Sequence, residues 1–239
     1  MKIALIGYGK MGKAIEEIAL QKKHEIVLKI NDENLSDLNL TNLQQCDVAI
    51  EFTNPESALT NIKACIDAGV PVVCGSTGWV AAEKEIIEYC TDKNGTLLYS
   101  SNFSIGVNIF FEINRKLAQL MSAQKEYNVA IEEIHHTQKK DAPSGTAISL
   151  AQQIISANNS KQNWTLNAAP TQAEICITSK RIDPAPGTHH VKYSSAIDDI
   201  EIIHTAHSRK GFAAGALIAA EFLVAKKGIF TMADVLKIA

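Results

Sequence analysis

The sequence predicts an α/β fold in which a doubly wound parallel sheet is joined to a mixed α+β domain. Residues 1–99 alternate short apolar runs with stretches of helical periodicity, and a glycine-rich turn follows the first run. After residue 102, strand-like runs are grouped together instead of alternating with helices. Alternation is typical of parallel sheets and grouping is typical of α+β domains. We therefore expect residues 1–104 with 209–239 to form one domain and residues 105–208 to form the other.

Each strand predicted in the first half is a continuous apolar run, and each predicted helix has apolar residues three and four positions apart. Pro55 suits a first helical turn, and Gly69 suits a helix end. The polar stretch 34–42 predicts no helix, so the second crossover connection is reduced. The predicted strands are Lys2 to Ile6, Ile26 to Ile30, Val48 to Phe52, Val70 to Val73 and Thr96 to Tyr99. The predicted helices are Lys10 to Ala19, Ala58 to Ala68 and Ala81 to Cys90.

The second half is predicted in the same way. Its predicted helices are Val107 to Met121 and Ser144 to Ser156. Its predicted strands are Val129 to Ile134, Ala173 to Ser179, His189 to Ser194 and Glu201 to Ala206. Two final helices, Ala213 to Ala225 and Met232 to Ile238, are expected to return to the first sheet and cover it.

The composition excludes several classes of protein. The 239 residues are 46% hydrophobic and carry 23 Lys and Arg against 26 Asp and Glu, so a globular core is expected and nucleic acid is not an expected partner. Five cysteines lack a CxxC pair, which argues against a zinc site or a disulfide framework and favours a cytoplasmic location. No window approaches the roughly 18 apolar residues of a membrane helix, so no membrane partner is expected.

Gly7, Gly9 and Gly12 form a G-x-G-x-x-G motif between the first predicted strand and helix. There the second glycine lets the backbone approach a pyrophosphate, which the free N–H groups of the helix start favour. Asp32 follows at the end of the second strand, where a carboxylate accepts ribose hydroxyls of NAD. We predict a Rossmann-type dinucleotide-binding domain whose cofactor contacts are Gly7, Tyr8, Gly9, Lys10, Met11, Gly12 and Asp32. A structural turn is the alternative; Asn31 is a second ribose candidate, and Lys10 and Lys29 leave binding of a 2′-phosphate open.

Residues 131–147, IEEIHHTQKKDAPSGTA, place ionisable side chains directly after an apolar strand. The side chains of His135 and His136 diverge on an extended chain, so chelation of one metal by both is unfavourable, and we predict no metal site. Behind Pro143, the free N–H groups of Gly145 and Thr146 at a helix start could hold a carboxylate. The alternative is an N-capped helix with two solvated histidines and two surface lysines.

Six motifs resemble those of the 4-hydroxy-tetrahydrodipicolinate reductase (dihydrodipicolinate reductase) family of the diaminopimelate route to lysine. They are IGYGKMG at the start, EFTNPE at 51–56, GSTGW at 75–79, SNFSIGVN at 101–108, EIHHTQKKDAPSGTA, and SRKGFAAGA near the end. The resemblance implies a reductase that uses NADH or NADPH on a small dicarboxylic substrate. It implies His135 as general acid, Lys139 as a second proton-donating or charge-stabilising residue, and His136, Gly145 and Thr146 as substrate contacts. It also implies that Gly75, Ser76, Thr77, Ser100, Ser101, Asn102 and Phe103 line the nicotinamide half of the site.

Two departures from the family pattern concern the cofactor. The glycine loop is one residue shorter than the GxGGRMG form, and Lys10 replaces its arginine. Asn31 and Asp32 stand where many members have Glu followed by an Arg that favours NADPH. We therefore expect NADH to be at least as good a cofactor as NADPH.

Two other functions are alternatives: a different NAD-dependent dehydrogenase acting on an aspartate-derived substrate, and a non-catalytic dinucleotide sensor. The string containing His135 and Lys139 argues against both. The resemblance also implies a homotetramer formed by sheet pairing of the second domain, although the short segment there leaves a dimer open. His189 and His190 follow Pro186-Gly187 and could reach the site from a loop, but we expect them in a surface loop. Arg209 either contacts a carboxylate or braces the hinge.

Overall fold

The computed structural model describes residues 1–79, 82–208 and 210–238, and the chain divides into two compact units. Unit 1 contains Met1–Ile105 and Lys210–Ala239, and unit 2 contains Gly106–Arg209. Arg209, for which the sequence left two roles open, lies outside the described residues, as does Ala81, the predicted first residue of a helix. Each unit has its own sheet and its own hydrophobic core, as described below.

Unit 1 is built on a six-stranded sheet with the order β11-β5-β4-β3-β1-β2, in which every neighbouring pair is parallel. Its strands are β1 (Lys2–Ile6), β2 (Glu25–Ile30), β3 (Val48–Glu51), β4 (Val72–Cys74), β5 (Thr96–Tyr99) and β11 (Gly228–Phe230). The order reverses at β1, because β2 lies on one side of it and β3, β4 and β5 follow on the other. In open parallel sheets, ligands bind beyond the carboxyl ends of the strands at such a reversal. The glycine loop directly follows β1 and therefore lies at this point.

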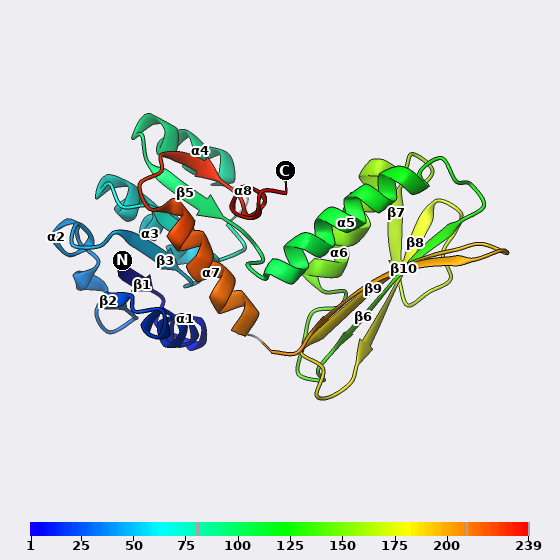
Figure 1. The fold of residues 1–239 in the computed structure, drawn as a ribbon, viewed down its shortest axis with the longest axis horizontal. Helices are drawn as coiled ribbons and strands as arrows, with labels where there is room; N and C mark the ends of the chain where they lie inside the picture. The colour runs from blue at the N-terminus through cyan, green and yellow to red at the C-terminus, as the bar shows by residue number, and fades with distance from the viewer. Residues whose placement is uncertain (80–81, 209, 239) are drawn as a thin grey trace. The chain divides into compact units, whose positions relative to one another are not determined.

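Helices cover both faces of this sheet (Figure 1). Helices α1 (Lys10–Gln21) and α7 (Lys210–Leu223) share one core with Leu5 of β1. Helices α3 (Pro55–Asp67) and α4 (Glu83–Asp92) share the other core with Ile6. Adjacent side chains of a strand point to opposite faces, which is why β1 contributes to both cores. The predicted return of a C-terminal helix to the first sheet is confirmed by α7.

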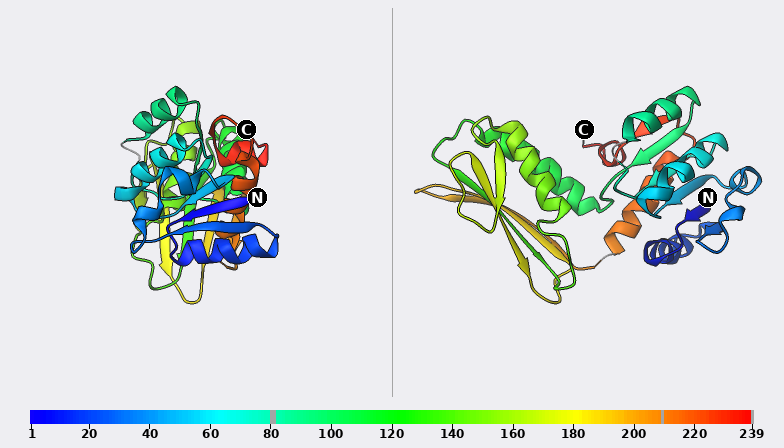
Figure 2. Two further views of the ribbon diagram at one scale, coloured as in Figure 1. Left: turned by 90° about the vertical axis from the view of Figure 1, so that its left-hand side faces the viewer. Right: turned by 180° about the vertical axis from the view of Figure 1, so that it is seen from behind.

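Unit 2 contains a mixed five-stranded sheet with the order β10-β9-β6-β8-β7. Its strands are β6 (Asn128–His135), β7 (Asn163–Leu166), β8 (Glu174–Arg181), β9 (Gly187–Ser194) and β10 (Asp199–Ala206). Strand β6 is central; it runs parallel to β8 and antiparallel to β9. Helices α5 (Ile105–Met121) and α6 (Gly145–Ala157) lie against one face of this sheet in both Figure 1 and Figure 2. Residues on that face of β6, such as Ile131 and Glu133, are therefore buried.

The predicted fold class is confirmed, and the differences are local. The sequence missed β7 and β11, which have only four and three residues. The polar stretch 34–42 was wrongly expected to hold no helix: it contains a 3₁₀ turn, η1 (Leu35–Asp37), and a single-turn helix, α2 (Leu40–Leu43), which the Asn39 side chain caps. A short final helix, α8 (Met232–Leu236), closes the described chain. No helix among the described residues is both long and apolar enough to cross a membrane.

Candidate active site

The loop between β1 and α1 requires glycine at two positions. Gly7 has φ +94°, and a Cβ atom there would lie 2.1 Å from the carbonyl oxygen of Phe52. A Cβ atom at Gly12 would lie 2.6 Å from the carbonyl oxygen of Gly7. The chain is held in this tight turn by the N–H groups of Gly7 and Tyr8, which both donate to the Ile30 carbonyl, at 3.0 and 2.9 Å. These two glycines are therefore needed for the fold of the turn itself.

Gly9 differs from them, because a Cβ atom built on it would have no neighbour within 4 Å. Gly9 immediately precedes α1, whose first N–H groups are free. A cavity of about 310 Å³ begins beside it, and Asp32, Asn54 and Asn61 are among the residues that line it. Open space at a glycine, a helix start and polar lining groups are what a dinucleotide phosphate and ribose require. The residues present therefore fit a nicotinamide dinucleotide.

The sequence left open whether Lys10 and Lys29 bind a 2′-phosphate of the cofactor. In the structure, Lys29 contacts two neighbouring side chains. Lys29 Nζ lies 2.7 Å from Glu16 Oε1 and 5.0 Å from the centre of the Tyr8 ring. The Tyr8 hydroxyl donates to the same Glu16 carboxylate. The hydrogen bond from Lys29 holds the pKa of Glu16 below its usual value. The positive charge of Lys29 is thus partly neutralised, and Lys10 is exposed.

The residues expected to line the nicotinamide half follow the carboxyl ends of β4 and β5. Ser76 is buried, and its Oγ accepts the Thr53 N–H at 2.8 Å. Ser100 Oγ donates to the Asn102 carbonyl at 2.7 Å, which fixes the second loop. Phe103 is 2% exposed and packs in the core, so its side chain is not open to a ligand. Gly75, Thr77 and Ser101 belong to the same two loops, of which Thr77 and Ser101 are exposed.

In unit 2, alternation along β6 brings Glu133 and His135 to the same buried face. Glu133 is fully buried and His135 is 7% exposed. His135 Nδ1 lies 3.1 Å from Glu133 Oε2, which is ion-pair distance, although the ring is turned away from the ideal hydrogen-bond direction. Neither atom has a hydrogen-bond partner of good geometry among the described residues. The contact between these two groups therefore offsets part of the free-energy cost of burying them.

The other oxygen of Glu133 collects donors from two further elements. Oε1 accepts the Ser144 N–H at 3.1 Å, the Ser179 hydroxyl at 2.6 Å and the Arg181 guanidinium at 3.2 Å. Burial alone would raise the pKa of Glu133, but the close contact with His135 and the hydrogen bonds from Ser144 and Ser179 outweigh it and hold the pKa well below the usual range. Glu133 is thus a buried carboxylate that stays ionised.

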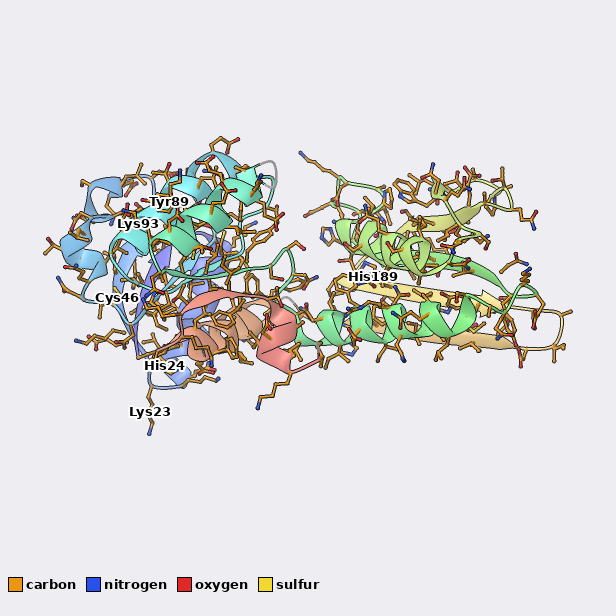
Figure 3. All side chains as sticks on the ribbon, turned by 90° about the horizontal axis from the view of Figure 1, so that it is seen from above. Lys23, His24, Cys46, Tyr89, Lys93 and His189 are labelled. Atoms are coloured by element: carbon orange, nitrogen blue, oxygen red, sulfur yellow. The ribbon has the colours of Figure 1, made fainter. Side chains whose placement is uncertain are left out.

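His189 lies in the same buried cluster, so the expectation of a surface loop was wrong. Residues 189 and 190 belong to β9, where side chains alternate. His189, which is labelled in Figure 3, is 5% exposed. Its ring centre lies 5.1 Å from that of His135, and its Nε2 lies 3.1 Å from Ser144 Oγ. Burial, followed by the charge of His135, lowers the pKa of His189 to about 3. The ring is therefore neutral near pH 7. His190, on the other face, lies 3.2 Å from Glu201.

Lys139 lies in the loop between β6 and α6, and Arg181 holds this loop in place. Lys139 Nζ donates to both Asp141 carboxylate oxygens at 2.8 Å. The Arg181 guanidinium donates to the backbone carbonyls of Lys139 and Asp141, at 3.4 and 2.6 Å, as well as to Glu133. Since one arginine links the strand to the loop, the position of Lys139 depends on that of Glu133.

The predicted carboxylate cradle is the start of α6. Ser144 is the N-cap, and its Oγ accepts the Ala147 N–H at 3.2 Å. Gly145 is exposed, Thr146 is half-buried, and a Cβ atom at Gly145 would have no neighbour within 4 Å. The backbone at the helix start is therefore accessible to an anion. His136 is half-buried, and the adjacent Thr137 is tied to Asp183 by two hydrogen bonds, at 3.1 and 2.6 Å.

Glu133, His135 and His189 are also close enough to hold a metal ion, since their ligand atoms lie within 4.8 Å of one another. The sequence did not suggest this grouping, because the three residues are not spaced as ligands. The Arg181 guanidinium already donates a hydrogen bond to the Glu133 carboxylate, and Ser144 Oγ already contacts His189 Nε2. A cation beside the carboxylate disfavours a second one, so the arrangement favours a hydrogen-bonded network.

Four members of the site were not predicted from the sequence: Glu133, Ser179, Arg181 and His189. Period-two alternation could have identified two of them: Glu133 lies between Ile131 and His135, and His189 lies two residues before Val191, on faces that are otherwise apolar. A polar residue on an apolar face needs a partner inside the protein. Ser179 and Arg181 lie on β8, and no local signal reveals that β8 pairs with β6. Trp79 packs against Tyr99 and donates to the Ser76 carbonyl at 2.7 Å.

Solved structures with this fold include a dipicolinate-bound dihydrodipicolinate reductase from Paenisporosarcina sp. TG-14, which is 23% identical, covers 97% of each chain and has a TM-score of 0.78. An amine dehydrogenase from Mycobacterium smegmatis is 12% identical over 97% of this chain and 95% of its own, with a TM-score of 0.63. At these identities the two likenesses establish the fold alone.

The sequence comparisons are more specific. The profile for the N-terminus of dihydrodipicolinate reductase matches residues 1–103, and that for its C-terminus matches residues 106–236. The chain is 51% identical over 240 aligned residues to 4-hydroxy-tetrahydrodipicolinate reductase of Christiangramia forsetii, covering 99% of this chain and 98% of the relative. It is 36% identical to the protein of that name in Methanosarcina acetivorans, over 98% of this chain and 88% of the relative. The chain belongs to the dihydrodipicolinate reductase family.

Proposed function

We propose that this chain is an oxidoreductase that reduces 4-hydroxy-tetrahydrodipicolinate to tetrahydrodipicolinate in the diaminopimelate route to lysine. The observation that carries the proposal is the buried His135, which lies 3.1 Å from the ionised Glu133 on β6 of unit 2. It stands beside the helix start that can receive a carboxylate. Reduction of a conjugated dicarboxylic substrate needs a proton donor and a site that binds a carboxylate, and His135 and the N–H groups at the start of α6 can supply these.

His135 is the general acid in this proposal. An imidazole titrates near neutral pH and can give a proton to the carbanion or enamine that develops on the substrate. Lys139 adds positive charge near the dianionic substrate, and it is already oriented by Asp141. One substrate carboxylate meets the N–H groups of Gly145 and Thr146, and the other meets His136 or Lys139.

The cofactor of this family is a nicotinamide dinucleotide, which supplies a hydride from C4 of its nicotinamide when bound. Gly7, Tyr8, Gly9, Lys10, Met11 and Gly12 would hold the pyrophosphate, with Asp32 on the ribose. Gly75, Ser76 and Thr77, with Ser100, Ser101, Asn102 and Phe103, would line the nicotinamide half. Asp32 is exposed at the cavity, and Lys29 is engaged by Glu16. A carboxylate repels a 2′-phosphate, so we propose that NADH serves at least as well as NADPH.

Unit 2 is proposed to bind substrate and to assemble the oligomer, which we expect to be a homotetramer. Strand β10 is an edge strand and exposes Ile200 and Ile203, which are 38% and 58% accessible. Exposed apolar residues on an unpaired edge favour pairing with another chain. Light scattering coupled to size-exclusion chromatography distinguishes a tetramer from a dimer. A cytoplasmic location is proposed because all five cysteines are free thiols.

The test couples the purified chain to dihydrodipicolinate synthase, aspartate semialdehyde and pyruvate and follows NADH absorbance. The proposal predicts oxidation of NADH only when all components are present. Absence of oxidation with either NADH or NADPH would refute it. Oxidation supported by aspartate semialdehyde alone would favour the alternative, a different dehydrogenase of an aspartate-derived substrate.

A further inference from the structure

We propose that Glu133 is a positioning residue that keeps His135 Nδ1 protonated and turned inward, so that Nε2 is the atom that delivers the proton. Gly187, which carries no side chain, leaves the space beside Nε2 open. This inference rests on the proposed function and adds to it the atom that donates and the residues that select it. In the step itself, the Nε2–H bond breaks and a C–H bond forms on the substrate, which leaves a neutral ring with its Nδ1 proton in place.

Glu133 can act in this way because its position is fixed from three directions. Its Oε1 accepts from Ser144 at the start of α6 and from Ser179 and Arg181 on β8. These contacts leave Oε2, which is buried and has no other hydrogen-bond partner among the described residues, facing His135 Nδ1 at 3.1 Å. A fixed acceptor on one side of an imidazole selects the tautomer that carries its proton on that side. The carboxylate therefore selects Nδ1–H.

The other nitrogen of His135 faces the first residue of β9. A Cβ atom built on Gly187 would lie 3.1 Å from Nε2 and 3.3 Å from Cδ2. These distances are tighter than ordinary contacts of a methyl group, so an alanine there would press on the Nε2 edge of the ring. The same strand places His189 with its ring centre 5.1 Å from that of His135.

Several ionisable groups belong to the same hydrogen-bonded and ion-paired network as His135. They come from β6, β8, β9 and the loop after β6, and they are Glu133, Arg181, His189, Lys139 and Asp141. Of the two acidic groups, only Glu133 is buried beside the ring. Removal of its charge therefore makes the protonated, proton-donating form of His135 harder to reach, whereas removal of a distant carboxylate leaves it unchanged.

The first experiment compares Glu133→Gln with Glu132→Gln. Glu132 precedes it on β6 but faces the other side of the sheet, where it pairs with Lys180 at 2.6 Å. We expect kcat of Glu133→Gln to fall about 10- to 100-fold at pH 8 and much less at pH 6, because acid restores the protonated donor. KM for the dinucleotide and all constants of Glu132→Gln stay near those of the wild type. An equal loss of kcat at both pH values, or no loss, would overturn the proposal in favour of a structural role.

The second experiment does not depend on turnover. Nitrogen NMR of histidine-labelled wild-type protein, assigned with His135→Gln, reports which ring nitrogen carries the proton. At high pH, where the ring is neutral, the proposal predicts the Nδ1–H tautomer, and an Nε2–H tautomer would contradict it. If the wild type is inactive in the coupled assay, the proposed function fails while this measurement still tests the role of Glu133.

The third experiment covers the case in which Glu133→Gln does not fold. Gly187→Ala changes no charge and crowds only the Nε2 edge, so we expect kcat to fall about tenfold or more with the wild-type pH profile retained. Gly145→Ala is the control for stability, because a methyl group added there has no neighbour within 4 Å. Its unfolding midpoint shows what a methyl group without a clash does to unit 2. If Gly187→Ala folds and keeps the wild-type kcat, Nε2 of His135 is not the atom that delivers the proton.

Discussion

The hydroxyl of Ser144, which caps α6, lies 3.1 Å from Nε2 of His189 on β9. Its oxygen also accepts the Ala147 N–H, so its own hydrogen is available for the imidazole. In the tautomer that carries its proton on Nδ1, the His189 ring accepts this hydrogen bond at Nε2. The low pKa of His189, about 3, keeps the ring neutral near pH 7, because burial disfavours its charged form. The start of α6, where we propose that substrate binds, therefore contacts a neutral histidine.

The first prediction concerns stability in acid. The pKa of His189 is about 3 in the folded chain, below the ordinary value of about 6.5 for an unfolded one, so unfolding takes up a proton between these values. The stabilising contribution is fully present above pH 6.5 and is lost as pH falls toward 3. By pH 5 the free energy of unfolding should have lost about 2 kcal/mol from this group alone. Urea unfolding at pH 7, 6 and 5 measures the loss.

The variant His189→Gln isolates this contribution, because it cannot take up the proton. Its free energy of unfolding should be lower than that of the wild type at pH 7, and the gap should narrow by pH 5. His207→Gln, an exposed position beyond the end of β10, is the matched control and should follow the wild type. A gap that stays constant from pH 7 to pH 5 would show that His189 does not supply this pH dependence.

The second prediction concerns Lys139. Lys139→Ala should lower kcat/KM for the substrate by about 10²-fold, because a fixed positive charge near the substrate carboxylate is removed. The Kd for NADH should not change. Lys140→Ala is the control, since this neighbour is exposed and its loss should have little effect. Steady-state kinetics at fixed ionic strength measure both, and equal losses in the two variants would indicate a general electrostatic effect.

The third prediction separates the two kinds of glycine in the loop after β1. Gly9→Ala should fold with a free energy of unfolding within about 1 kcal/mol of the wild type, because nothing lies within 4 Å of the added methyl group. It should weaken NADH binding about tenfold or more, because the methyl group enters the space proposed for the pyrophosphate. Gly12→Ala, whose methyl group would meet the Gly7 carbonyl, should lose stability as well. Fluorescence titration with NADH and urea unfolding are measured for each variant. Wild-type NADH affinity in Gly9→Ala would exclude this loop as the pyrophosphate-binding site.

The fourth prediction concerns the choice of cofactor. Asp32→Asn removes the exposed carboxylate of the cavity, so the ratio of kcat/KM for NADPH to that for NADH should rise about tenfold. Direct Kd values for the two dinucleotides should change in the same sense. Glu33→Gln, the exposed neighbour, should leave the ratio unchanged. A wild type that strongly prefers NADPH would contradict the assignment of Asp32.

Much of the fold could be predicted because the local patterns and the tertiary structure agree. Strand β1 is a buried apolar run, and α3 begins at Pro55 with Asn54 as its cap, both of which are visible in the sequence. Strand β7 could not be recognised, because its four residues carry no clear alternation and it is defined by pairing with β8. The mistaken placement of His189 had the opposite cause: Pro186 and Gly187 suggested a turn, whereas β9 begins at Gly187 itself.

The candidate site was predictable only where its residues are neighbours in the sequence. His135, Lys139 and the helix start at Gly145 lie within eleven residues, so one motif contained them. The buried network around Glu133 draws Arg181 from β8 and His189 from β9, and strand order and register bring these together. The register between strands is set only when the sheet forms. A single sequence therefore does not show which polar residues of β8 and β9 will lie beside Glu133.

The role of His135 as the proton donor is tested by the rate of NADH oxidation in the coupled assay, measured side by side for the wild type and His135→Ala. The account predicts that the wild type oxidises one NADH for each substrate molecule formed. It predicts that His135→Ala is slower by about 10²-fold or more while its Kd for NADH is unchanged. An inactive wild type, or a His135→Ala protein that turns over at the wild-type rate, would contradict it.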